Sequence, residues 1–176
     1  DGADVNSVTA VVMADSYVQK TFVIDLSELS EGDLEVLLPV VSEETEGLAV
    51  EETSSTVSGG SSADPITGGV ANGKATAAVT VPGGTVLQDA DGNPVEGDSV
   101  TLSVTAADTS SSAGAAITPE GLNAGSTTTV KQPVGVASVE MVDSNGVKIK
   151  KFSQPITVSM AIPADKGVST GDMLTL

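Results

Sequence analysis

Residues 100–106 read VTLSVTA, an unbroken alternation of apolar and hydroxyl-bearing side chains. Successive side chains of a β-strand point to opposite faces, so this segment presents one apolar face and one hydroxyl face. Antiparallel sheets commonly pack one face on a core and leave the other in water. We therefore expect the hydroxyls to face solvent and four residues to lie in a core: Val100, Leu102, Val104 and Ala106.

The same period of two recurs along the chain, where a helix would show a period of about 3.6. Residues 156–162 (ITVSMAI) repeat the pattern closely. Further strands are expected at residues 8–13, 21–26, 34–41, 75–81, 127–130 and 136–142. The sequence therefore predicts an all-β fold of antiparallel β-sandwich type, Ig-like or Greek-key, as one sandwich or as a partial sandwich followed by a complete one.

Turn residues separate these segments. Asn-Gly pairs stand at residues 72–73 and 145–146, and both residue types tolerate the positive φ of tight primed hairpins. The second pair would make residues 136–142 and 147–152 antiparallel partners. A third turn is expected at residues 91–94 (DGNP).

Composition excludes several classes of function. The 176 residues include 24 acids and seven bases, all lysine, which gives a formal net charge of −17, and there is no His, Cys or Trp. Neither a Ser-His-Asp or Cys-His nucleophile nor a thiolate or imidazole zinc site can be built, and we expect no enzymatic activity. The strong negative charge and the lack of arginine argue against nucleic acid as a partner. No apolar run approaches the roughly 20 residues that span a bilayer, so membrane insertion is not expected.

Composition also suggests how the chain is organised. We expect a small acidic β module over residues 1–52, or the end of a module that starts upstream, then a Ser/Gly-rich linker or exposed loop over 53–73. A β-sandwich module over 74–176 follows, truncated at its C-terminus because the chain stops within an apolar alternation. The abundance of Gly, Ser, Thr and acids favours an exported protein whose signal peptide has been removed, at the cell surface or outside the cell.

Three segments of the second half carry a family likeness. Residues 81–95 (VPGGTVLQDADGNPV), 139–146 (VEMVDSNG) and 152–158 (FSQPITV) form a pattern that resembles the zona occludens and Unc-type sandwich of ankyrins, netrin receptors and many large bacterial surface proteins. Upstream, residues 11–26 and 34–41 are similar to the last strands of carboxypeptidase-regulatory-like (transthyretin-like) modules, with Ser16 where glycine would be usual. These families lack catalytic activity, so the resemblance implies a structural, adhesive or scaffolding role and brings no active-site residues.

The strongest candidate for a ligand site lies in residues 89–98 (DADGNPVEGD). Calcium takes six to eight hard oxygen ligands, and the alternating Asp89, Asp91 and Asn93 could converge on one ion. An EF-hand-like loop would need a bidentate Glu at its twelfth position, which Val100 occupies. The same residue types are preferred in β-turns, so a solvent-exposed turn is the favoured interpretation and calcium the alternative cofactor.

Two sets of residues are candidates for interactions. The first is the apolar, terminal segment 5–13, which we expect to be poorly supplied with local partners and available for pairing outside its own sandwich through Val8, Val11, Val12 and Met13. The second is the only basic cluster, where Lys148 and Lys150 alternate on one strand face. These lysines would either pair with carboxylates of a neighbouring module or protect an exposed sheet edge.

A covalent cross-link is a further chemical option. A Lys–Asn isopeptide bond needs a buried lysine, an Asn or Asp, and a catalytic carboxylate; Lys74 or Lys131 could serve, and spacing singles out neither.

These observations favour a non-catalytic structural or adhesive subunit of an extracellular or cell-surface assembly. It would pair with itself or with other surface proteins by β-strand addition. Two alternatives stay open: a passive spacer or accessory module of a larger secreted enzyme, and a calcium-stiffened linker.

Overall fold

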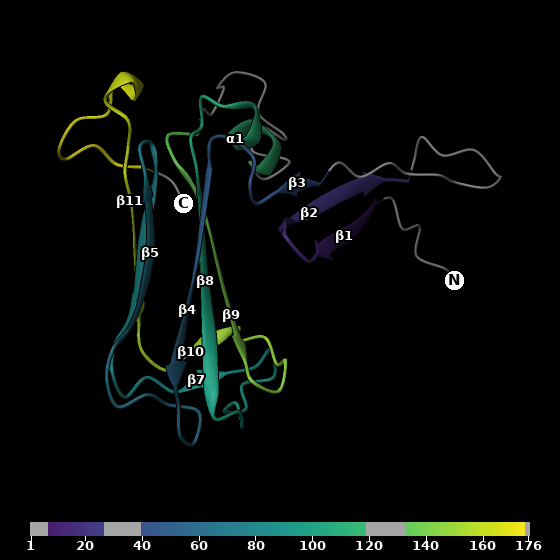
Figure 1. The fold of residues 1–176 in the computed structure, drawn as a ribbon, viewed down its shortest axis with the longest axis vertical. Helices are drawn as coiled ribbons and strands as arrows, with labels where there is room; N and C mark the ends of the chain where they lie inside the picture. The colour runs from purple at the N-terminus through teal and green to yellow at the C-terminus, as the bar shows by residue number, and fades with distance from the viewer. Residues whose placement is uncertain (1–6, 27–39, 119–132, 175–176) are drawn as a thin grey trace.

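The computed structural model describes residues 7–26, 40–118 and 133–174 (Figure 1). Two three-stranded antiparallel sheets form its main body. The first sheet has the order β4-β8-β9, with β4 (Leu48–Thr56), β8 (Ser99–Ala107) and β9 (Val136–Asp143). The second has the order β11-β6-β5, with β5 (Ile66–Asn72), β6 (Ala75–Val81) and β11 (Thr157–Met160). The predicted antiparallel all-β sandwich is therefore confirmed.

Smaller elements close the ends and one side of this sandwich. A third sheet, β1-β2-β3, lies beside it and is made of β1 (Ser7–Ala14), β2 (Tyr17–Asp25) and β3 (Val41–Ser42) (Figure 1). The pair β7 (Leu87–Gln88) and β10 (Lys151–Phe152) lies at the opposite end from α1 (Ser112–Ile117). A 3-10 turn, η1 (Ala164–Lys166), follows β11.

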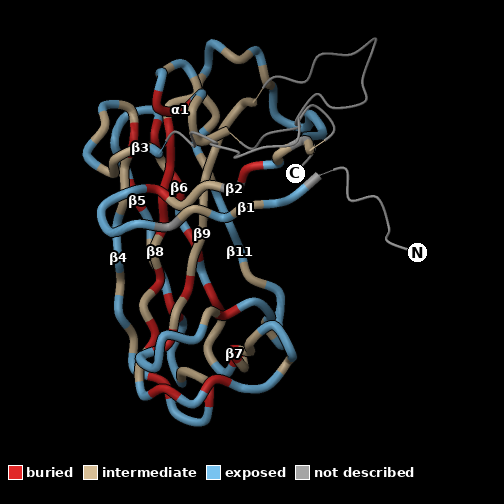
Figure 2. Tube along the Cα trace, turned by 90° about the vertical axis from the view of Figure 1, so that its right-hand side faces the viewer, coloured by how far each residue is buried: buried red, intermediate tan, exposed pale blue. Residues whose placement is uncertain are grey.

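The main core lies between the two large sheets, where the tube of Figure 2 is coloured as buried. The four residues expected there are confirmed, since each is at most 2% exposed: Val100, Leu102, Val104 and Ala106. They face apolar residues of β6, among them Val79 and Val81. The hydroxyl face of β8 departs from expectation at one position, because Thr105 is buried beneath the third sheet.

The Ser/Gly-rich stretch 53–73 is not a linker in the structure. Its first residues complete β4, which pairs with β8 from Leu48↔Ala107 to Thr56↔Ser99, and its last residues form β5. The sandwich therefore begins at β4, ahead of the expected start at residue 74. The linker was predicted from the serine and glycine content, but glycine has a packing role at this point of β5. A Cβ on Gly68 would lie 2.9 Å from a methyl of Leu102.

The two Asn-Gly turns behave differently. At residues 72–73 the expected hairpin is confirmed, with Asn72↔Ala75 as its last pair and Gly73 at φ 58°. At residues 145–146 the hairpin is confirmed only next to the turn, where Val142 bridges Lys148. Beyond it the chain leaves β9, and residues 150–152 pair with β7 instead.

Other expected strands differ in extent. The strand expected over residues 156–162 is shorter, as β11, and the strand over 8–13 extends to both sides as β1. β1 pairs along its length with β2, so the expectation that this segment lacks a local partner is wrong. The strand expected over 127–130, and residues 34–39 of the segment 34–41, lie outside the described residues.

Candidate functional site

The third sheet is held against the sandwich near its hairpin turn. Ala14↔Tyr17 is the last pair of β1 and β2, and Ser16 in the turn has φ 65°, the left-handed conformation that glycine adopts most easily. The Ser16 carbonyl accepts a hydrogen bond of 3.0 Å from the N–H of Glu43. Val18 of β2 is buried in a small second core with Leu48, Ala107 and Ala113.

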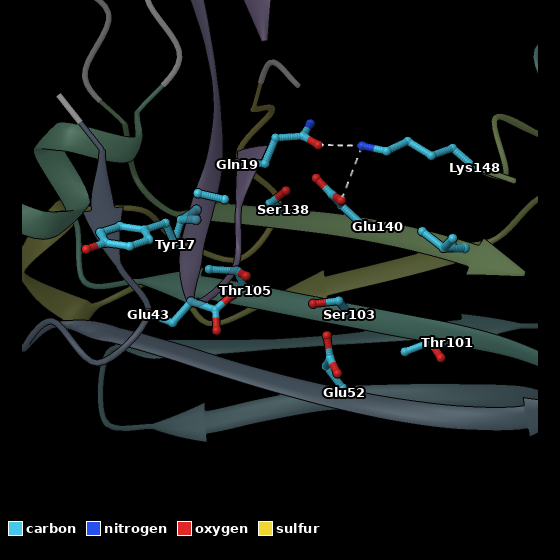
Figure 3. A pocket seen from close by; sticks show the side chains of 13 residues that line it. Tyr17, Gln19, Glu43, Glu52, Thr101, Ser103, Thr105, Ser138, Glu140 and Lys148 are labelled. Atoms are coloured by element: carbon cyan, nitrogen blue, oxygen red, sulfur yellow. Dashed lines mark hydrogen bonds and ion pairs between the residues drawn. The ribbon is translucent and has the colours of Figure 1, made fainter. Parts of the chain in front are cut away.

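Below this contact, a pocket of about 310 Å³ opens between β2 and the outer face of β4, β8 and β9 (Figure 3). On the sheet side its wall is made mainly of hydroxyls and carboxylates from the outward faces of the three strands, with Val142 of β9 as an apolar residue among them. The principal side chains that line it are Tyr17, Gln19, Glu52, Ser103, Glu140 and Lys148.

Three of these side chains meet across the pocket. Lys148 Nζ donates a hydrogen bond of 2.7 Å to Gln19 Oε1 and lies 3.8 Å from Glu140 Oε2 (Figure 3). Glu140 Oε1 is buried and has no hydrogen-bond partner among the described residues. Since the lysine and glutamate side chains are about one third exposed (34% and 32%), this ion pair is half-buried. The arrangement brings an amine, a carboxamide and a carboxylate into contact.

Sequence reasoning singled out Lys148 and missed Gln19 and Glu140. Gln19 is separated from Lys148 by 129 residues, so no spacing rule could pair them. A weak signal existed at Glu140, which is the one charged residue of β9 ahead of its terminal Asp143. Lys150 is exposed, and its backbone N–H donates to the carbonyl of Gln88.

The turn expected over residues 91–94 is shifted towards the N-terminus: its hydrogen bonds close residues 89–93, and Asp89 organises it. Asp89 Oδ1 accepts from the backbone N–H groups of Gly92 and Asn93, both at 2.8 Å, and Oδ2 accepts from Asn93 Nδ2 at 3.2 Å. The backbone hydrogen bond from Asn93 is the main reason why the pKa of Asp89 lies below its ordinary value.

This geometry bears on the calcium hypothesis. Asp89 already uses its carboxylate within the turn, the amide of Asn93 points to Asp89, and Asp91 is exposed. Within residues 7–26, 40–118 and 133–174, no three acidic side chains are grouped as metal ligands. Calcium binding here stays a prediction, which a chelator-sensitive unfolding temperature would support and an unchanged one would contradict.

A buried carboxylate beside this turn escaped the sequence analysis. Asp143 ends β9 and is 4% exposed. Its Oδ1 accepts from the N–H groups of Asn145 and Val147, at 3.0 and 2.8 Å, and its Oδ2 accepts from the N–H of Gly97 at 3.0 Å. Asp143 therefore fixes the turn after β9 and ties it to the loop before β8.

The interaction residues of the N-terminal segment lie on β1. Val8 and Val11 are 43% and 50% exposed, and Val12 is half-buried. Met13 is on the same strand, next to the irregularity in register between Val12 and Ala14.

Comparison with known proteins returns no relative: no protein-family model, no curated protein and no solved structure matches the chain. The fold and the pocket define the class as an antiparallel β-sandwich with a docked hairpin. No helix in the part of the chain that the structure describes is long and apolar enough to cross a membrane. Arguments about function therefore rest on the geometry.

Proposed function

We propose that the chain is a non-catalytic structural or adhesive subunit of an extracellular or cell-surface assembly, and that it self-associates by β-strand addition. The observation that carries this proposal is the outer edge of β1. That edge is eight residues long (SVTAVVMA) and contains neither a charge nor a proline, in a chain whose formal net charge is −17.

Two other edge strands of the sandwich, β4 and β11, carry features that oppose strand addition, whereas β5 (ITGGVAN) is a shorter edge strand that contains two glycines and no charge. The edge strand β4 exposes Glu51 and Glu52, and β11 is only four residues long, with Pro155 and Pro163 close to its ends. Charges, prolines and short length are the usual means by which natural sheets protect their edges. Among the described residues, β1 is the longest edge strand that carries neither a charge nor a proline.

The edge of β1 also offers side-chain contacts. A strand that pairs with an edge gains backbone hydrogen bonds, and the side chains that alternate along it determine which strand fits. Val8 and Val11 differ in parity along β1, so exposed apolar surface is present on both faces of the hairpin. Pairing would cover both valines and the backbone groups of β1 that face away from β2 and have no strand partner in the described part of the chain.

The test compares two exposed valines on different edge strands. V11K places a charge on β1, whereas V158K places the same charge on β11, where the valine is 44% exposed. We expect the wild-type protein and V158K to form oligomers or filaments, and V11K to remain monomeric, because a lysine on the edge must be desolvated or repelled when strands pair. Light scattering after size-exclusion chromatography and negative-stain electron microscopy measure the outcome, and circular dichroism verifies folding.

Two results would contradict self-association through β1. Equal loss of assembly in V11K and V158K would show that a charge on either edge strand has the same effect, so β1 would not be the specific site of pairing. A wild-type protein that is monomeric at all concentrations would instead favour the second candidate, a spacer or accessory module of a larger secreted enzyme.

A further inference from the structure

We propose that Lys148 and Gln19 form an intramolecular isopeptide bond that joins the hairpin β1–β2 covalently to the sandwich, with Glu140 as the proton acceptor. This inference does not depend on self-association. It rests on the contact across the pocket described above, where the amine and the carboxamide oxygen are 2.7 Å apart.

The first argument is proximity. The 2.7 Å hydrogen bond between Nζ and Oε1 holds the amine next to the carboxamide whose Cδ it would attack. Reactants that are held in contact in this way behave as if they were present at very high effective concentration. The pocket also opens to solvent, which gives a released small molecule a way out.

The second argument is the unexplained oxygen of Glu140. Its Oε2 faces Lys148 Nζ at 3.8 Å, while Oε1 is buried without a hydrogen-bond partner among the described residues. Buried polar atoms are nearly always hydrogen-bonded, and one that is not calls for an explanation such as a catalytic role. A carboxylate beside an amine can accept the proton that the amine must lose before it acts as a nucleophile.

The reaction balances without a co-reactant. Lys148 Nζ transfers a proton to the Glu140 carboxylate, and its lone pair attacks Gln19 Cδ, so that the Nζ–Cδ bond forms. A second proton leaves the attached nitrogen, the carboxylate delivers a proton to Nε2, the Cδ–Nε2 bond breaks, and ammonia leaves. In water the ammonia becomes ammonium, so an ammonium and a carboxamide are converted into a secondary amide and free ammonium. Nothing is oxidised or reduced.

The site differs from the Lys–Asn cross-link considered from the sequence in two ways: the carboxamide belongs to Gln19, and Lys148 is half-buried. The other lysines considered for a cross-link lack this arrangement. Lys74 Nζ lies 3.5 Å from an Asp165 carboxylate oxygen, and both side chains are exposed, as in a surface ion pair. Lys131 lies outside the described residues. The chain has no cysteine, so a disulfide cannot fasten the hairpin to the sandwich. The proposed bond would close a loop between positions 129 residues apart.

Intact-mass spectrometry of the purified full chain tests the proposal. We expect the wild-type protein to be lighter than its sequence mass by one ammonia, about 17 Da. K148R retains the charge and the length of the side chain but cannot form the bond, so it should have its full mass. The matched control, K150R, changes the neighbouring exposed lysine and should keep the deficit.

Peptide mapping and a third variant complete the test. Digestion of the wild type should yield one branched peptide that contains positions 19 and 148, and E140Q should reduce its yield at least tenfold with unchanged circular dichroism. Full mass in the wild type after prolonged incubation would overturn the proposal. A deficit that persists in K148R would also overturn it, because it would come from succinimide formation at Asn72-Gly73 or Asn145-Gly146. An unchanged yield in E140Q would overturn the role of Glu140.

Discussion

One buried side chain, Asp143, holds together the turn after β9 and the loop before β8. Its carboxylate accepts hydrogen bonds from three backbone N–H groups, those of Gly97, Asn145 and Val147. Hydrogen bonds to a buried charged acceptor are worth more than neutral ones, and a donor left without its partner adds a desolvation cost. Asp143 therefore stabilises the end of the sandwich opposite α1.

D143N should lower the free energy of unfolding by about 2–4 kcal/mol, because the amide replaces one acceptor oxygen with a donor group that faces backbone N–H. Urea unfolding followed by far-UV circular dichroism measures the change. The control is D172N, since Asp172 accepts a hydrogen bond from the N–H of Ser169 at an exposed site and should change stability little. Equal effects of the two substitutions would contradict the assigned role of Asp143.

Asp89 provides a prediction about pH. Its pKa in the folded protein is lowered, mainly by the backbone hydrogen bond from Asn93. The turn therefore contributes stability that is fully present above the ordinary aspartate pKa of about 3.9 and is lost as the pH falls through the lowered folded-state value. NMR titration of the Asp89 carboxyl carbon should give a midpoint below that of a short peptide of residues 88–94. A midpoint at or above the peptide value would contradict this turn geometry.

Among the elements, β5 is the strand in which glycine has a clear structural reason. Gly68 lies so close to β8 that an added Cβ would be 2.9 Å from Leu102, whereas Ala71 on the same strand is exposed. We expect G68V to lower the free energy of unfolding by about 1–3 kcal/mol through overpacking. A71V should have little effect, and urea denaturation compares the two. Similar values for both would mean that β5 and β8 are not in close contact.

Sequence patterns predicted β6, β8 and β9 because their inward residues alternate with small or polar ones. They did not predict β4 and β5, where Ser, Thr, Gly and Glu predominate. These two strands exist because neighbours impose them: β4 pairs along its whole length with β8, and β5 pairs with β6. Local composition contains no information about such partners.

The pocket was unpredictable for a related reason. Its contact between Gln19 and Lys148 depends on how a whole sheet docks, over a separation of 129 residues. The turns, in contrast, depend on local chemistry: those expected at residues 72–73 and 145–146 are present, and the one expected at 91–94 forms over residues 89–93.

At the scale of the whole molecule, net charge governs association. A formal charge of −17 makes each copy repel the next, and this repulsion acts over about 10 Å at 0.1 M salt but only about 3 Å at 1 M. If copies pair through the uncharged edge of β1, raising the salt concentration from 0.1 M to 1 M should increase the assembled fraction. Light scattering measures it, with V11K as the control that stays monomeric at both concentrations. Assembly that falls with salt would indicate ion pairing between copies instead.

Tyr17, at the mouth of the pocket, has a practical consequence. It is the only tyrosine of a chain without tryptophan, so the tyrosine fluorescence of the protein comes from beside the turn of the hairpin β1–β2, where the hairpin meets the sandwich. Emission should follow undocking of the hairpin, while circular dichroism follows melting of the sandwich. The two optical signals together would show whether the third sheet detaches before the rest of the molecule unfolds.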